Sequence, residues 1–197
     1  MDKIILASGS PRRKLLLEWA EIQFDVVVSS IEESYPANLP PQEIAEHIAS
    51  NKANAVRNQL ATNNNHYTIL AADTVVVLEQ NIIGKPTDRE DAVSILKSLS
   101  GKFHDVITGV CILSAGKEIS FSEKTIVQFH ELSLAQIQYY VDHYKPYDKA
   151  GAYAIQEWIG VVGVKSINGD FYNVMGLPVS RVVKELTILA LSKPADN

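Results

Sequence analysis

The sequence predicts an α/β fold of the mixed α+β kind, in which helices flank a mixed sheet. Apolar β-forming runs alternate with segments of helical periodicity along the chain. Some of these runs are linked by hairpin turns and others are separated by helices, which indicates a sheet with both strand directions. The chain has 197 residues, 46% of them hydrophobic and 21% charged, as is typical of a globular protein with a substantial core.

The first part of the chain predicts three strands and two helices. Residues 3–7 form a short apolar strand, and Ser10-Pro11 then supplies an N-cap and a proline at the start of a helix. A second strand follows at 24–29, and a long helix extends from about 41 to 60. Residues 67–78 are a strongly β-forming run.

Turn and capping motifs follow this run. A turn at 79–81 leads into the loop Gly84-Lys85-Pro86. Thr87 with Glu90 forms a capping box, which begins a helix that ends near Gly101.

The rest of the chain predicts two strands at 106–113 and 125–129 and a helix that begins at the capping box of Ser133 and Gln136. Asn168-Gly169 is typical of a hairpin turn. We therefore expect two further strands, at 161–167 and 171–175, and a final helix after Pro178.

Charge and cysteine content exclude several classes of protein. The 18 basic and 23 acidic residues give a net charge of −5, which argues against binding to a nucleic acid polymer. Cys111 is the single cysteine, so no intrachain disulfide forms, and its apolar neighbours predict a buried, inert thiol. No apolar run approaches the ~18 residues of a membrane span, and the N-terminus is unlike a signal peptide. We therefore expect a cytoplasmic protein that does not associate with membranes.

Two arginines follow a small, flexible loop at the start of the first helix. The loop Ser8-Gly9-Ser10 presents backbone N–H groups at the positive end of a helix dipole, and Arg12 and Arg13 add guanidinium groups that match a phosphate. Cations are unfavourable at a helix N-terminus, so a bound anion would resolve the conflict. The alternative is a solvated, charged first turn without a ligand.

Asp73 and Lys52 interrupt apolar patterns. Asp73 lies within an apolar strand, where an unpaired carboxylate is costly, so it either makes structural hydrogen bonds or serves as a general base or metal ligand. Lys52 lies within an apolar stripe of its helix and either extends to the surface or places its ammonium in a polar pocket.

Lys85 and the acidic pair Glu32-Glu33 are weaker candidates. Lys85 is held between a glycine and a proline, although a surface lysine in a turn is the ordinary alternative. Glu33 could complete a metal site with Asp73, or the pair could simply be exposed. The five histidines show no spacing typical of metal ligands. Together the candidates suit a small, phosphate-rich substrate with a divalent metal.

At these residues the sequence resembles the Maf-type nucleoside triphosphate pyrophosphatases. The matching motifs occur in family order from residue 3 to about 181, and they are LASGSPRR at 6–13, IEE at 31–33, ADTVV at 72–76, GKP at 84–86, LSG at 99–101, DKAGAY at 148–153, IQ at 155–156 and NVMGLP at 173–178.

The resemblance implies both a fold and a reaction. The expected fold is one Maf-like, inosine-triphosphatase-like domain over residues 1–197, with two lobes of a mixed sheet around a central cleft. The expected reaction is hydrolysis of a nucleoside triphosphate to the monophosphate and pyrophosphate with a divalent cation, Mg²⁺ or Mn²⁺, which would remove non-standard or excess nucleotides. A homodimer is also expected.

The resemblance further assigns roles to individual residues. Asp73 would activate or orient the attacking water and, with Glu33, contact the metal. The residues that would hold the phosphates are Ser8, Arg12, Arg13, Lys52 and Lys85. The segment that ends in Gln156 is similar to the branch that prefers dTTP and UTP, in which Arg12, Thr74 and Gln156 occupy specificity positions.

Two departures lie beside Gln156, since the family usually has glycine where this chain has Ala154 and Glu157. Ala154 would strain the segment if its position needs a positive φ, and Glu157 would bring a negative charge near an anionic ligand. Both departures bear on base preference rather than on the type of reaction. Two alternatives stay open: a branch of the family that prefers 7-methyl-GTP, and a nucleotide-binding regulator of septum formation without turnover, a role with which the family is also associated.

Overall fold

The computed structural model describes residues 3–31, 34–36, 38–60 and 67–191. Its elements in chain order are β1 (Lys3–Leu6), α1 (Pro11–Trp19), β2 (Phe24–Val26), α2 (Pro41–Leu60), β3 (Tyr67–Leu78), β4 (Asn81–Ile83), α3 (Arg89–Leu99), β5 (Phe103–Ser114), β6 (Lys117–Phe129), α4 (Leu134–Tyr144), the 3₁₀ turn η1 (Ala150–Ala152), α5 (Trp158–Gly163), β7 (Val164–Asn168), α6 (Phe171–Met175) and α7 (Val179–Leu191). None of the helices in these ranges is long and apolar enough to cross a membrane.

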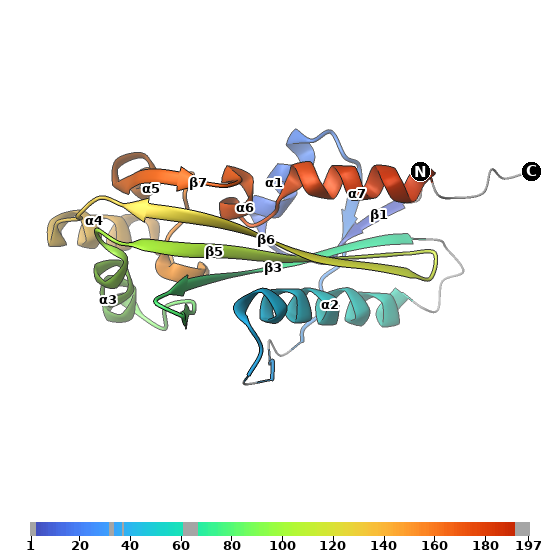
Figure 1. The fold of residues 1–197 in the computed structure, drawn as a ribbon, viewed down its shortest axis with the longest axis horizontal. Coiled ribbons are helices and arrows are strands. Elements are labelled where there is room, and N and C mark those ends of the chain that lie inside the picture. The colour runs from blue at the N-terminus through green and yellow to red at the C-terminus, as the bar shows by residue number, and fades with distance from the viewer. Residues whose placement is uncertain (1–2, 32–33, 37, 61–66, 192–197) are drawn as a thin grey trace, which may run out of the picture. The chain divides into compact units, whose positions relative to one another are not determined.

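The strands form one mixed sheet of seven strands in the order β2-β1-β3-β5-β6-β7, with β4 paired to β3 (Figure 1). The chain divides into two compact units, and the long strands β3, β5 and β6 contribute residues to both. Unit 1 comprises the described residues within 1–73, 109–122 and 176–197, and unit 2 comprises residues 74–108 and 123–175. The predicted mixed α/β fold with flanking helices is confirmed, whereas the cleft between two lobes stays a prediction.

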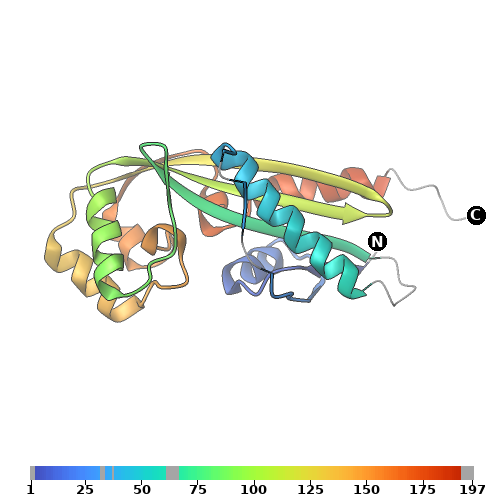
Figure 2. The same ribbon diagram turned by 90° about the horizontal axis from the view of Figure 1, so that it is seen from below.

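Unit 1 is built around parallel strands. β1 pairs in parallel with β2 on one side and with β3 on the other, so that Leu6 lies opposite both Val26 and Leu70. Parallel neighbours need crossover connections, and α1 and α2 lie in these connections. Figures 1 and 2 show α2 on one face of this part of the sheet and α1 and α7 on the other, so the strands are covered on both faces.

Small side chains let α2 approach the sheet closely. Ala49 and Ala53 of α2 pack against Ala71 of β3 within a buried apolar cluster. Gly109 in β5 lies directly under the helix, because a Cβ at this position would come within 2.2 Å of the Ala45 carbonyl carbon. Glycine at this position therefore sets how near α2, and with it Lys52, lies to the sheet.

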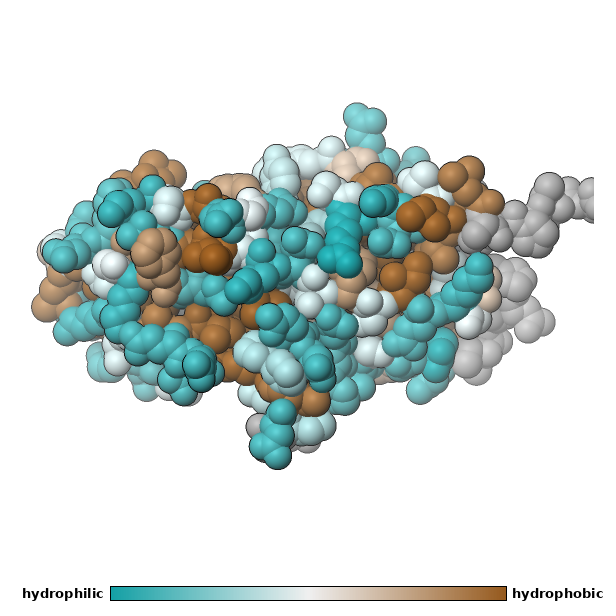
Figure 3. Space-filling view, in the orientation of Figure 1, coloured by the Kyte–Doolittle hydropathy of each residue, from teal (hydrophilic) through white to brown (hydrophobic). Residues whose placement is uncertain are grey.

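Unit 2 contains antiparallel pairings. β4 pairs with the end of β3 through a short hairpin, and β7 pairs with β6 at the sheet edge. Helices α3 and α4 pack against each other. The core of this unit includes His104, Phe129 and Tyr153, whose rings meet edge to face with centroids 5.0–5.4 Å apart. Figure 3 shows hydrophilic residues over the visible face, with smaller hydrophobic groups between them.

His104 is a buried histidine that is neutral in the folded protein. It is 2% exposed, and its Nε2 lies 2.7 Å from the Tyr153 hydroxyl. Burial lowers the pKa of His104 from 6.5 to about 4, while the nearby Asp105 carboxylate opposes part of this shift.

The predicted hairpin at Asn168-Gly169 is wrong. β7 begins at Val164 and pairs with β6, and Phe171–Met175 forms the helix α6 instead of a strand. The turn prediction considered only local sequence, whereas Asp170 accepts a hydrogen bond from the Tyr172 N–H and so favours the start of a helix.

Two further expectations are corrected. The N-cap of α3 is Asp88 rather than Thr87, since its side chain accepts from the Asp91 N–H at 2.8 Å. The short strand β4 begins at Asn81, the last residue of the expected turn, and ends before the expected loop at 84–86, where no strand was predicted. The bounds of α2 and β3 and the capping box of Ser133 and Gln136 are confirmed. The strands expected at 24–29, 106–113 and 125–129 are present with other bounds, and the first part of the strand expected at 161–167 belongs to the helix α5.

We predict that Gly109→Ala destabilises the protein by about 3 kcal/mol or more, because a new methyl group meets rigid helix backbone. Chemical denaturation would measure the free energy of unfolding. Gly84→Ala is the matched control, since no atom lies within 4 Å of a Cβ there, and we expect a change below about 0.5 kcal/mol. Equal stability of the two variants would contradict the close approach of α2.

We predict that His104 makes stability fall as the pH drops from about 6.5 to 4. The unfolded chain binds a proton at pH 6.5 and below, while the folded protein resists it until about pH 4, so the unfolded state gains protons first. Between pH 7 and pH 5 the wild type should lose about 2 kcal/mol more of unfolding free energy than His104→Gln. Identical pH profiles would contradict the buried neutral imidazole.

Candidate functional site

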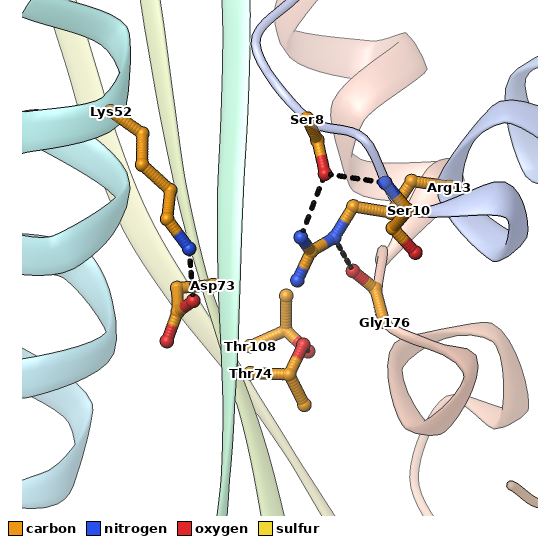
Figure 4. Close-up of polar contacts among 8 residues, drawn as sticks. All are labelled: Ser8, Ser10, Arg13, Lys52, Asp73, Thr74, Thr108 and Gly176. Atoms are coloured by element: carbon orange, nitrogen blue, oxygen red, sulfur yellow. Dashed lines mark hydrogen bonds and ion pairs between the residues drawn. The ribbon is translucent and has the colours of Figure 1, made fainter. Parts of the chain in front are cut away.

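The loop between β1 and α1 is organised by Ser8 and Arg13. The Ser8 hydroxyl oxygen accepts from the Ser10 N–H at 3.3 Å and from Arg13 Nη1 at 3.0 Å (Figure 4). Arg13 also donates from Nε to the Gly176 carbonyl at 2.7 Å. Ser8 and Arg13 are both buried. Arg13 therefore ties the β1–α1 loop to the chain that precedes α7.

The start of α1 keeps the character of an anion site. Ser10 is the N-cap but makes no side-chain capping bond, Pro11 occupies the first turn, and no acidic residue lies in that turn. The buried Arg13 and the half-buried Arg12 place positive charge where the helix dipole is also positive. The predicted loop and cap position are confirmed, while phosphate binding by Ser8, Arg12 and Arg13 stays a prediction.

Lys52 and Asp73 form a direct ion pair. Lys52 Nζ donates to Asp73 Oδ1 at 2.6 Å, and the two side chains are only 16% and 12% exposed. The Lys52 ammonium is thus bonded to a largely buried carboxylate and does not extend to the surface. The pair satisfies the carboxylate that the apolar pattern of β3 made costly, and it fixes the orientation of that carboxylate.

The register of β3 decides which groups can face Asp73. Ile69 and Ala71 pack toward α2, so Asp73, two residues further along the strand, points to the same face. Figure 4 shows Lys52 and Asp73 on one side of the β3 ribbon and the Ser8–Arg13 group on the other. Within unit 1, the structure therefore brings four of the predicted residues together as two separate pairs, Ser8 with Arg13 and Lys52 with Asp73.

Thr74 belongs to a polar network in unit 2. Its hydroxyl lies 2.9 Å from that of Thr108 (Figure 4). Thr108 in turn donates to the Asn173 carbonyl at 3.0 Å. Asn173 is fully buried and donates from its amide to the Val106 carbonyl and to Thr125 Oγ1. Because Thr108 gives its single hydroxyl hydrogen to Asn173, it accepts from Thr74.

Thr108 was missed by the sequence reasoning, although a threonine within the apolar run 106–113 is the kind of interruption that identified Asp73. Gly176 was missed as an individual contact, because a carbonyl acceptor leaves no trace in side-chain chemistry. It has a φ of +115°, a conformation that favours glycine, and so its presence in the motif has a backbone reason.

Lys85 and Gln156 are exposed residues of unit 2. Lys85 follows β4, in a loop where the Gly84 carbonyl accepts from the Gly151 N–H at 3.1 Å. Gln156 lies in a turn directly before α5. Glu33 lies outside the described residues. Its role and those of Lys85 and Gln156 stay predictions.

Ala154 and Glu157, the two departures from the family pattern beside Gln156, are both accommodated by the structure. Ala154 is absent from the described residues that have a positive φ, so it does not strain the turn as the glycine comparison suggested. The Glu157 carboxylate accepts from the Tyr140 hydroxyl and lies 3.6 Å from Lys149 Nζ. Its negative charge is therefore held by partners within unit 2.

The donor set fits a divalent cation only in part. Within the described ranges, no group of three or more His, Cys, Asp or Glu side chains could hold a metal ion. Mg²⁺ commonly uses one or two carboxylates together with substrate phosphates and water, and Asp73 supplies a carboxylate of that kind.

The buried Cys111 is not a competing nucleophile, because burial raises the pKa of its thiol to about 12.

Comparisons with known proteins agree with these motifs. The family model for Maf-like proteins matches residues 3–189. A dTTP/UTP pyrophosphatase of Parabacteroides distasonis is 49% identical over 185 residues, which cover 93% of this chain and 94% of that protein. Proteins of the same name from Bacteroides thetaiotaomicron and Bacillus cereus strain G9842 are 48% and 49% identical to this chain. Each match covers 94% of this chain, and the two matches cover 96% and 95% of those proteins. The chain belongs to the family of Maf-like proteins.

Proposed function

We propose that this protein is a nucleoside triphosphate pyrophosphatase that hydrolyses dTTP and UTP to the monophosphate and pyrophosphate. The observation that carries the proposal is the contact between Asp73 and Lys52, a base and a cation held 2.6 Å apart in a largely buried position. The names of the relatives support both the reaction and the two substrates. The enzyme would thereby remove non-standard or excess nucleotides.

The reaction needs a water molecule to be aligned with the α-phosphorus. The water oxygen bonds to the α-phosphorus, the bridging bond from that phosphorus to the β-phosphate oxygen breaks, and pyrophosphate leaves. Asp73 accepts a hydrogen bond, and then a proton, from the attacking water. Lys52 holds the Asp73 carboxylate in one orientation, and its ammonium would also contact a phosphate oxygen of the bound substrate.

The charges of the triphosphate require several cationic or N–H donors. Ser8, Arg12 and Arg13 supply hydroxyl and guanidinium groups at the N-terminus of α1, and Lys85 supplies a further ammonium. A bound Mg²⁺ or Mn²⁺ ion would neutralise phosphate charge, and Asp73 and Glu33 are the residues that would hold it.

Base recognition is assigned to the exposed Gln156 and to two partly buried polar residues. Gln156 carries an amide that offers one acceptor and a donor group, which suits the edge of uracil or thymine. Arg12 and Thr74 would complete the specificity set. We also propose that the enzyme acts in the cytoplasm as a homodimer, on a small-molecule substrate rather than a nucleic acid polymer.

We predict that Asp73→Asn lowers the rate of pyrophosphate release from dTTP by at least about 100-fold, because the amide cannot accept the proton of the attacking water. Asp25→Asn is the matched control, since Asp25 also pairs with a lysine, Lys3, but both side chains are more than half exposed. A coupled assay for pyrophosphate with Mg²⁺ or Mn²⁺ makes the measurement. Full activity of Asp73→Asn would exclude the assigned role.

We predict that Gln156→Ala lowers kcat/KM for dTTP and UTP by about 10- to 100-fold, since hydrogen bonds to the base are lost. A panel of triphosphates with product analysis by chromatography tests base choice and reaction type together. Preference for 7-methyl-GTP would reject the base assignment, and binding without pyrophosphate release would favour a regulator.

Removal of the divalent ion with EDTA should abolish pyrophosphate release.

A further inference from the structure

The turn that carries Gln156 is closed by its own backbone. The Glu157 N–H donates to the Ala154 carbonyl at 3.1 Å, and α5 begins at the next residue, Trp158. Ala154 and Ile155 are buried, whereas Gln156 is exposed. Gln156 is thus the exposed tip of an otherwise packed turn.

One buried hydroxyl is bonded to both ends of this turn. Tyr140 of α4 is fully buried, and its hydroxyl oxygen accepts from the Ala154 N–H at 3.2 Å. The same hydroxyl donates its hydrogen to Glu157 Oε2. Tyr140 therefore holds residues 154 and 157 at a fixed separation, with Gln156 between them.

A lysine completes the cluster. Lys149 Nζ lies 3.6 Å from Glu157 Oε1 and 2.7 Å from Asp148 Oδ1, and Lys149 as a whole is only 8% exposed. The Glu157 carboxylate thus has a hydroxyl donor on one oxygen and an ammonium near the other. We call Tyr140, Lys149 and Glu157 the turn cluster.

The turn is also held from the side of α5. The Gly160 N–H donates to the Glu157 carbonyl at 2.9 Å. A Cβ on Gly160 would come within 1.8 Å of the Ile155 carbonyl oxygen, so only glycine permits this approach. The backbone on both sides of Gln156 is therefore fixed by contacts that do not involve the Gln156 side chain.

The turn cluster places charged groups in a largely buried position, which costs free energy of desolvation. Buried ionic groups can often be replaced by apolar side chains of similar volume without loss of stability. A network of directed hydrogen bonds instead fixes the conformation of the turn. Among the turn residues 154–157, Gln156 is the one that is exposed.

We propose that Tyr140, Glu157 and Lys149 are positioning residues, which hold the Gln156 turn in the conformation that recognises uracil or thymine. This inference rests on the proposed function and deepens it. The turn cluster acts on how well uracil and thymine are distinguished from other bases, and it takes no part in the chemistry at Asp73.

The decisive variant is Tyr140→Phe, which removes one oxygen atom and both hydrogen bonds to the turn. We expect KM for UTP and dTTP to rise about tenfold with kcat nearly unchanged, and the ratio of kcat/KM for UTP to that for CTP to fall by a similar factor. Tyr144→Phe is the matched control. Tyr144 lies on the same helix and stacks on Tyr140 at 4.9 Å, but its hydroxyl has no part in the turn cluster.

Variants of Glu157 separate positioning from stability. Glu157→Gln keeps an acceptor for the Tyr140 hydroxyl and should retain most of the discrimination between UTP and CTP. Glu157→Ala removes the acceptor and should resemble Tyr140→Phe. Circular dichroism and thermal unfolding check each fold, and if Tyr140→Phe fails to fold, the two Glu157 variants decide.

The outcomes separate the two proposals. If the wild type releases no pyrophosphate from UTP or dTTP, the proposed function fails and the inference fails with it. If the wild type discriminates between bases, but Tyr140→Phe and Glu157→Ala discriminate equally well, the proposed function stands and the positioning role is overturned. A fall in kcat without a change in discrimination would overturn it as well.

Discussion

The alternation of side chains along β3 is the constraint on which the site depends. Successive residues of a strand point to opposite faces, so Asp73 and Thr74 cannot share an environment. Asp73 points toward α2 and must find a cation there, because Ile69 and Ala71, which precede it on the same face, are apolar. Lys52 meets this need, and its position in α2 then becomes as tightly specified as the position of Asp73 in β3. A shift of one residue in β3 would bury the carboxylate on the face without Lys52.

The packing of α2 serves the same pair. Gly109, Ala49 and Ala53 remove bulk between helix and sheet, so the lysine side chain reaches the carboxylate without crossing a gap. A larger residue at any of these positions would move the helix axis and lengthen the ion pair. The apolar core and the polar site are therefore specified together, since the size of core residues sets the distance between charged ones.

Several features that depend on residues close together in the sequence were predicted correctly. The bounds of α2 and β3 and the capping box at Ser133 follow from periodicity and from side chains three residues apart, and all were predictable from the sequence. Asp73 and Lys52 were identifiable because each interrupts an apolar pattern. Their contact was not predictable, since Lys52 lies in a helix and Asp73 in the strand that follows it, 21 residues further along the chain. The hairpin at Asn168-Gly169 failed for the same kind of reason, because β7 pairs with a strand that is distant in sequence.

The approach of Gly160 to Ile155 belongs to a short and continuous region. The contacts described for the Gln156 turn all come from residues 140–160, while Asp73 is held by a residue of α2. The Gln156 turn and the ion pair of Asp73 and Lys52 thus draw on different stretches of the chain. An exchange of residues 140–160 between relatives would replace the turn and its supporting contacts together, and would leave Asp73 and Lys52 unchanged.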